Sequence, residues 1–303
     1  MGARTFAYVR FAHPTKPRPS MISRADPAGT TSDGNVGFAA GNTPTVFTEV
    51  LCGIDGTPTA LRAVARTCEL VAPEAHVAIL VCTGAGAWIS HNRAQQALTT
   101  AAEIARRAGV NAETLLDPAG PPVERVLERA ESHRLLALGA PMVPRGTGLW
   151  IGGVALYAVH HLPSSLLIAR EPPLGAGEQI VLALDGSEDA PGLIKIAAHA
   201  ARRLRRGVVV VHAVGVESRS ERHHLEAERR RLAEALGAAP QVVVEAKPPV
   251  DAILDVARER QASLIVMGSR RIGGVRALGS VSERVAHRAR CSVLIIRPEE
   301  GRT

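Results

Sequence analysis

The sequence predicts an α/β protein with two tandem domains, each an open five-stranded parallel sheet sandwiched between helices. Short apolar runs of strand length alternate with longer amphipathic segments of helical period from about residue 47 to residue 298, a pattern typical of βαβ units. Aromatic residues make up only 3% of the chain, so the cores must consist of Val, Ile, Leu and Ala, which suits parallel strands buried on both faces. The length of 303 residues fits two domains of ordinary size.

Two stretches of the chain recur, and their spacing indicates a duplicated domain. Val50–Thr57 matches Ile180–Ser187, so that Asp55 corresponds to Asp185. Gly152–Arg170 matches Gly279–Arg297 without a gap. Because matching residues are separated by nearly the same length of chain at opposite ends of the repeat, we interpret the chain as two copies of one domain.

The domain boundaries follow from this repeat and from composition. We expect a first domain at residues 45–171 and a second at residues 178–298, joined by a linker that contains prolines and glycines. Residues 1–44 are rich in Pro, Gly, Ser and Thr and show no hydrophobic period, which predicts a disordered N-terminal tail. An over-extended start site is the alternative interpretation of that segment.

The second domain shows the alternation of strands and helices most clearly. Gln179–Leu184 is a short apolar strand that ends at Asp-Gly-Ser, and Pro191–Arg205 follows with its apolar residues on one helical face. Gly207–Val214 is nearly continuous and β-branched, which predicts a buried strand, and Glu217–Leu236 is predicted to be a charged helix that packs through leucines. The remaining elements are a strand at Gln241–Glu245, a helix at Pro249–Arg260, a strand at Ser263–Met267, a helix at Ser282–Arg290 and a strand at Ser292–Ile296.

The first domain repeats this order. Its predicted strands lie near Val50–Ile54, Val77–Val81, Ala112–Leu116, Leu135–Leu138 and Ser165–Ala169, and the helices between them near Pro58–Val71, Arg93–Ala108 and Pro122–Ser132.

Composition argues against several classes of protein. No apolar segment approaches the roughly 20 residues that cross a bilayer, and the N-terminus lacks a secretory h-region, so we expect a cytoplasmic protein without membrane contact. The net charge of +7 comes largely from arginine clusters on predicted helices, without interleaved aromatic residues, which argues against nucleic-acid binding. The four cysteines show neither CxxC nor zinc-ligand spacing, and Cys52 and Cys82 are expected to be buried in strands.

Three segments of each domain are predicted to meet at the carboxyl edge of its sheet. They are the Asp-Gly-Ser/Thr turn after the first strand, the end of the second strand and the glycine-bearing loop after the fourth. In the second domain this loop runs from Gly268 to Ser282 and opens a helix. The backbone N–H groups of that helix, with the hydroxyls of Ser280 and Ser282 and the charge of Arg270, form a candidate phosphate cradle. The same residues also fit glycines that only make turns, with Ser280 as a helix N-cap.

Taken together, these motifs resemble the universal stress protein family. The resemblance rests on the strand followed by Asp-Gly-Ser, on Met-Gly-Ser-Arg at residues 267–270, on Gly-Ser-Val-Ser-Glu at residues 279–283 and on the closing Cys-Ser-Val-Leu-Ile-Ile-Arg-Pro. It implies an adenine nucleotide α-hydrolase-like, Rossmann-like fold in each half. Similar single-domain proteins pair through their last strands, so the resemblance predicts an intramolecular pseudo-dimer joined by Ser165–Ala169 and Ser292–Ile296. Association of two whole chains into a homodimer is left open.

The resemblance also implies a ligand and its contacts. Similar domains bind ATP, so an adenine nucleotide is the implied ligand, with Mg²⁺ arriving only together with it. Adenine and ribose are placed near Leu184, Asp185 and Ala213, and the phosphates near Gly268, Arg270, Gly279, Ser280, Val281 and Ser282. The corresponding residues of the first domain are Ile54, Asp55, Gly139 and Gly152.

Both domains depart from the ATP-binding pattern, and they depart differently. In the second domain Arg271 replaces a glycine, and the loop from Gly268 to Gly279 is shorter than in the family pattern. In the first domain the loop from Gly139 keeps the family length, but Met142 stands at the second glycine and Gly153 at the hydroxyl residue. We expect the better site in the second domain, because its Gly-Ser-Val-Ser is intact.

Three functions fit these observations. The first is a stress-response regulator that binds an adenine nucleotide and signals through its conformation or through protein partners. The second is a nucleotide-free interaction module with degenerate pockets, and the third is a slow ATPase. The sequence shows no Ser/His/Asp order, carboxylate pair or Walker lysine that favours turnover, so we expect a non-catalytic protein. His212, at the end of the second strand of its domain, is expected to be a hydrogen-bonded structural residue.

Overall fold

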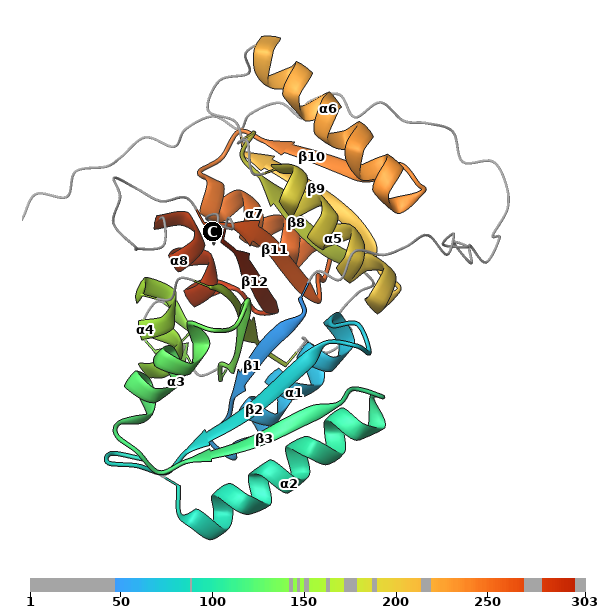
Figure 1. Cartoon of the computed structure of the whole chain (residues 1–303). Coiled ribbons are helices and arrows are strands. Elements are labelled where there is room, and N and C mark those ends of the chain that lie inside the picture. Colours follow the sequence, from blue (N-terminus) through green and yellow to red (C-terminus); the bar gives the residue numbers. More distant parts are fainter. Residues whose placement is uncertain are drawn as a thin grey trace, which may run out of the picture. The chain divides into compact units, whose positions relative to one another are not determined.

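The computed structural model in Figure 1 shows the α/β fold that the sequence predicts. It describes residues 47–87, 89–141, 144–145, 148–149, 153–161, 164–171, 179–186, 190–213, 219–269 and 280–297. We call residues 47–171 the first half and residues 179–297 the second half. The tail predicted at residues 1–44 lies outside the described residues.

Strands and helices alternate along the first half. Helix α1 begins where Pro58 supplies a helical φ and the Thr57 hydroxyl accepts a hydrogen bond from the backbone N–H of Ala60. In chain order the elements are β1 (Glu49–Gly53), α1 (Pro58–Leu70), β2 (His76–Cys82), α2 (His91–Arg107), β3 (Ala112–Asp117), α3 (Pro122–Ala130), β4 (Leu135–Gly139), β5 (Pro144–Arg145), β6 (Gly148–Leu149), α4 (Gly153–His161) and β7 (Ser165–Ala169).

The second half follows the same order, without a counterpart of β5 and β6 in its described part. Its elements are β8 (Gln179–Leu184), α5 (Ala190–Leu204), β9 (Gly207–Ala213), α6 (Arg219–Leu236), β10 (Gln241–Glu245), α7 (Pro249–Glu259), β11 (Leu264–Gly268), α8 (Ser280–Arg288) and β12 (Ser292–Ile296).

The sequence-based prediction differs from the structure in the stretch that follows β4 and at the start of α8. The short β5–β6 hairpin falls in a region that the sequence predicts to be loop, and the sequence predicts no range for α4. Helix α4 has apolar residues around most of its circumference, so it lacks the amphipathic period by which helices are recognised. Helix α8 begins earlier than predicted, at Ser280, which places both Ser280 and Ser282 in its first turn.

The long strands form one continuous sheet. Its order is β10-β9-β8-β11-β12-β7-β4-β1-β2-β3, so each half contributes its strands in the order third, second, first, fourth, fifth. In this sheet the described pairings within each half are parallel, and the junction between the halves, β12 with β7, is antiparallel. The short β5–β6 pair is antiparallel and forms a separate sheet. The strands expected to join the halves therefore do pair.

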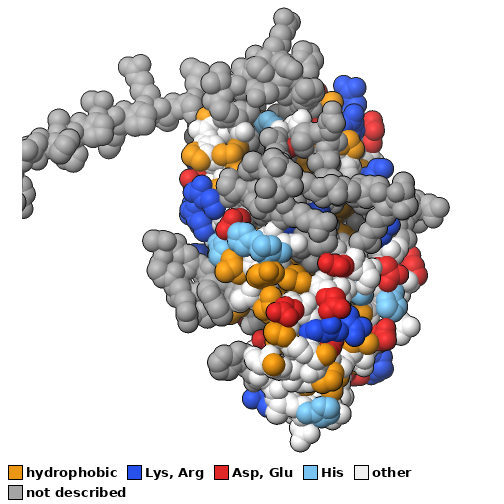
Figure 2. Space-filling model, turned by 60° about the vertical axis from the view of Figure 1, so that its left-hand side comes forward, with side chains coloured by type: hydrophobic (Ala, Val, Ile, Leu, Met, Phe, Trp, Pro, Cys, Tyr) orange, Lys and Arg blue, Asp and Glu red, His pale blue; other side chains and the backbone are white. Residues whose placement is uncertain are grey.

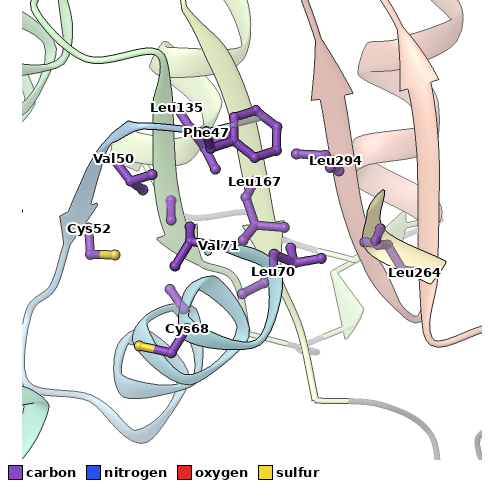
Figure 3. Packing of buried hydrophobic residues seen from close by; sticks show 14 of the residues in the cluster. Phe47, Val50, Cys52, Cys68, Leu70, Val71, Leu135, Leu167, Leu264 and Leu294 are labelled. Carbon is purple, nitrogen blue, oxygen red and sulfur yellow. The ribbon is translucent and has the colours of Figure 1, made fainter. Parts of the chain in front are cut away.

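Helices cover both faces of this sheet. One buried cluster takes side chains from α1, α2, α5 and α6, and the other from α3, α4, α7 and α8. Leu167 of β7 and Leu294 of β12 are register partners, and both belong to the first cluster. Figure 3 shows part of this cluster, which also contains Leu70 and Val71. All residues of β7 and β12 are buried, as expected for strands covered on both faces.

Polar contacts support the junction between the halves. The backbone N–H of Arg170 donates to Ser292 Oγ at 3.1 Å, and that of Arg297 donates to Ser165 Oγ at 3.2 Å. His199 of α5 contacts the carbonyl oxygen of Leu70, at the end of α1, through Nε2 at 2.6 Å. A carbonyl can only accept, so Nε2 carries the proton. Burial lowers the pKa of His199, which keeps its ring neutral at pH 7.

Within the described ranges, no helix combines the length and the apolar character that crossing a membrane requires.

Candidate functional site

The carboxyl edge of the second-half sheet brings together several of the residues singled out in the sequence. Leu184 and Asp185 end and follow β8, Ala213 ends β9 and Gly268 ends β11. Because α8 is followed by β12, a strand parallel to β11, the helix begins at this same edge. The first turn of α8 and the ends of three strands therefore face one region.

In the first half, the aspartate in the turn after β1 accepts hydrogen bonds that hold the turn. Oδ1 of Asp55 accepts hydrogen bonds from the backbone N–H of Thr57 at 2.9 Å and from its hydroxyl at 2.6 Å. Gly56 between them has a φ of +80°, a conformation that favours glycine. Asp55 thus fixes the entry into α1, and Ile54 beside it is buried. Its counterpart Asp185 is exposed and precedes Gly186, whose φ of +71° indicates a similar turn.

The ends of β8 and β9 are tied together by a histidine. Nδ1 of His212 lies 3.1 Å from the carbonyl oxygen of Leu184, so this nitrogen is the donor, and the side chain is buried. The expected hydrogen bond of His212 is confirmed. Leu184 is buried and Ala213 half-buried, which gives this strand edge an apolar floor.

The glycines that end the fourth strands differ in what surrounds them. A Cβ atom at Gly139 would lie 2.2 Å from the carbonyl oxygen of Thr59, so the first turn of α1 rests directly on the end of β4. A Cβ atom at Gly268 would instead meet a methyl group of Leu193 at 3.3 Å, a side chain that can adjust. The strand end is therefore closed by backbone in the first half and bordered by a flexible side chain in the second.

Helix α8 is partly described at its start. Ser282 is buried and Val281 half-buried, and Ser280 lies in the first turn of the helix. Three residues predicted to contact phosphate, Arg270, Gly279 and Gly152, lie outside the described residues.

Glu228 is a residue of this region that the sequence analysis missed. It lies on α6, is only 4% exposed, and its Oε2 has no hydrogen-bond partner among the described residues. Burial raises its pKa to about 7, and the negative charge of Asp185 adds to the shift, whereas Arg231 opposes it. The signal was present in the helical period, because Glu228 lies one helical turn before the buried Leu232 and so belongs to the same packing face.

Among the described residues, the cysteines are not reactive nucleophiles and the acidic residues do not form a metal site. All four cysteines are buried, and burial raises the thiol pKa to about 12 for Cys52 and Cys291 and about 11 for Cys68 and Cys82. At neutral pH they are uncharged thiols of low reactivity. Within the part of the chain that the structure describes, no three His, Cys, Asp or Glu side chains form a group that could hold a metal ion.

The fold defines a class of protein, an open α/β protein of the kind that binds ligands at the carboxyl ends of its parallel strands. Comparison with known proteins gives the family. The family model of universal stress proteins matches residues 178–297. A universal stress protein of Thermus aquaticus is 35% identical over 134 residues, which are 39% of this chain and 97% of the relative.

Solved structures extend the likeness of fold over both halves. A universal stress protein from Archaeoglobus fulgidus has a TM-score of 0.66 at 21% identity, covering 82% of this chain and 97% of that one. A putative universal stress protein from Pseudomonas aeruginosa has a TM-score of 0.62 at 20% identity, covering 83% of this chain and 94% of that one. The chain belongs to the universal stress protein family.

The different surroundings of the two glycines predict different tolerance to a methyl group. Gly139→Ala should lower the free energy of unfolding by about 1–3 kcal/mol, because backbone atoms of α1 must move. Gly268→Ala is the matched control and should change it by less than about 1 kcal/mol, because Leu193 can adjust. Denaturant unfolding of both variants measures the difference. Equal destabilisation would contradict the closed first-half strand end.

Replacing Glu228 with a neutral side chain should raise the stability of the protein in a pH-dependent way. Its native pKa of about 7 lies above the ordinary 4.5, so the native state holds a proton that the unfolded state loses between these values. The free energy of unfolding therefore falls as the pH rises from 4.5 to about 7, because this carboxyl loses its proton more easily in the unfolded state. Glu228→Gln should be more stable than wild type at pH 8, by on the order of 1–3 kcal/mol, and equal to it near pH 4.5.

The control for this measurement is Glu226→Gln, an exposed position on the same helix. Melting temperatures of both variants between pH 4.5 and 8 provide the comparison. A gain from Glu228→Gln that does not depend on pH would refute the raised pKa.

Proposed function

We propose that the second half binds an adenine nucleotide, ATP in the first instance, and that the protein acts as a nucleotide-responsive regulator. The observation that carries this proposal is the position of α8, whose first turn lies at the carboxyl edge of the sheet, where β8, β9 and β11 end. A helix N-terminus presents unpaired backbone N–H groups and a partial positive charge, which suit phosphate.

The chemistry of the neighbouring groups fits the rest of a nucleotide. Leu184 and Ala213 provide apolar surface for a base. The carboxylate of Asp185 accepts hydrogen bonds, and ribose hydroxyls donate them. The buried Glu228 lies on this side of the site, and the electrostatic interaction between the two carboxyls favours a neutral, donor-bearing group there over a phosphate. Phosphates are thus best placed at α8 and the ribose at β8, with Mg²⁺ accompanying the phosphates.

The first half is less suited to the same ligand. The backbone of Thr59 rests against Gly139 and closes that strand end. We therefore assign the nucleotide to the second half, and regard the first half as a domain of the same ancestry that supports it.

One observation favours the interaction module as a second candidate. Leu156 and Tyr157 of α4 are exposed by 36% and 47%, and the Tyr157 ring stacks on His161 with centroids 4.1 Å apart. On the face drawn in Figure 2, hydrophobic and histidine side chains lie side by side. Exposed apolar groups of this kind are typical of contact surfaces.

The nucleotide content of the freshly purified protein tests the proposal, measured by heat release and mass spectrometry. Wild type should carry an adenine nucleotide or bind added ATP, and saturating ATP at about 100 times the Kd should stabilise it by about 2.7 kcal/mol. Gly279→Val, directly before α8, should weaken binding at least about tenfold, because the bulkier residue obstructs the approach to the helix N-terminus.

The matched control is Gly152→Val, at the equivalent position of the first repeat, which should keep the nucleotide. Absence of nucleotide together with no thermal shift on adding ATP, ADP or AMP would refute the proposal and favour the interaction module. Release of phosphate that falls in Gly279→Val would instead identify a slow ATPase.

A further inference from the structure

Side chains of the first half hold both ends of α8. Near its C-terminus, Nη2 of Arg170 donates to the carbonyl oxygen of Ala286 at 2.5 Å. In its first turn, Glu283 is contacted by His160 of α4, whose Nε2 lies 3.4 Å from Oε1. The helix that offers its first turn to the ligand thus contacts the other half at each end.

The bond from Arg170 to Ala286 matters because it partners a buried charge. Its side chain is fully buried, and Nε and Nη1 have no hydrogen-bond partner among the described residues, so its bond to Ala286 carries much of the compensation for burying the charge. Burial lowers the pKa of Arg170 to about 10, so the guanidinium remains charged at neutral pH. A cation beside the last carbonyls of a helix also interacts favourably with the helix dipole. Moving α8 away would remove the acceptor that Ala286 offers to this buried charge.

The arginine contact occurs a second time at the equivalent residues of the repeat, but the contact between histidine and glutamate does not. Nη2 of Arg297, the repeat counterpart of Arg170, donates to the carbonyl oxygen of Val159 in α4 at 3.2 Å. The position of α4 that matches Glu283 is occupied by Leu156, which carries no charge to pair with His287. The arginine contact thus recurs in both halves, whereas the acid–base contact of α8 has no equivalent at this position of α4.

We propose that Arg170 and His160 are positioning residues, through which the first half fixes α8 and thereby sets the nucleotide affinity of the second half. This inference rests on the proposed function for its ligand, and on the contacts of α8 for its structural part. Coupling of this kind is reciprocal, so a bound nucleotide must stabilise the contacts of Arg170 and His160 by the same free energy by which these contacts favour binding.

Two readouts on the full-length protein test the inference, hydrogen exchange of the α8 amides without nucleotide and the Kd for ATP. Arg170→Met should raise the exchange of α8 and weaken ATP binding about tenfold. Arg170→Lys keeps one donor and should restore part of the affinity. His160→Ala removes a half-buried side chain, should weaken binding about two- to threefold, and carries the test if Arg170→Met fails to fold.

The matched controls are Arg297→Met and His287→Ala. Arg297→Met removes the mirror contact and should raise exchange in α4 while leaving the Kd within about twofold of wild type, and His287→Ala should leave both α8 exchange and the Kd unchanged. Equal weakening by Arg170→Met and Arg297→Met would show a general loss of stability and overturn the inference. Unchanged α8 exchange in Arg170→Met and His160→Ala would overturn it even if ATP binds. A wild type that binds no ATP refutes the proposed function separately, and increased α8 exchange in the variants still supports the positioning role.

Discussion

The antiparallel pairing of β7 with β12 is the interaction on which the rest of the structure depends. Each half has its strands in the same order, and each would end in an unpaired strand of fully buried character if it stood alone. Such edges expose backbone hydrogen-bonding groups and apolar side chains together. Pairing removes both edges, merges the two sheets into one, and brings α4 and α8 close enough for His160 to contact Glu283.

The junction is symmetric, whereas the surroundings of the two candidate sites are not. Its arginines and serines are related by the repeat, since Arg170 bonds to Ser292 as Arg297 bonds to Ser165 across the paired strands. Around this symmetric centre the surroundings of the two candidate sites diverge. Backbone closes the strand end at Gly139, and a side chain borders Gly268. The packing at the two strand ends therefore differs, although the junction between the halves is symmetric.

Much of the fold was predictable because it follows from local patterns. The β-branched run at Gly207–Ala213 and the apolar run at Ser292–Ile296 are strands in the structure, and the repeat indicated their equivalents. The bounds of helix α4 were not predicted, because its apolar residues show no helical period. The burial of Glu228 was missed because charged side chains are usually exposed, although its position one turn before Leu232 indicated the packing face. The bond from Arg170 to Ala286 could not be predicted, since a long-range contact leaves no local signal. The glycine pattern identified both candidate sites and favoured the second, and the packing around Gly139 and Gly268 adds a difference that the sequence did not indicate.

The most direct test of this account is differential scanning calorimetry of the full-length protein. If β7 and β12 join the halves into one cooperative unit, unfolding should occur in a single transition whose van't Hoff and calorimetric enthalpies agree. Two resolved transitions, each with about half the enthalpy, would show that the halves unfold independently and would contradict the central role of the junction.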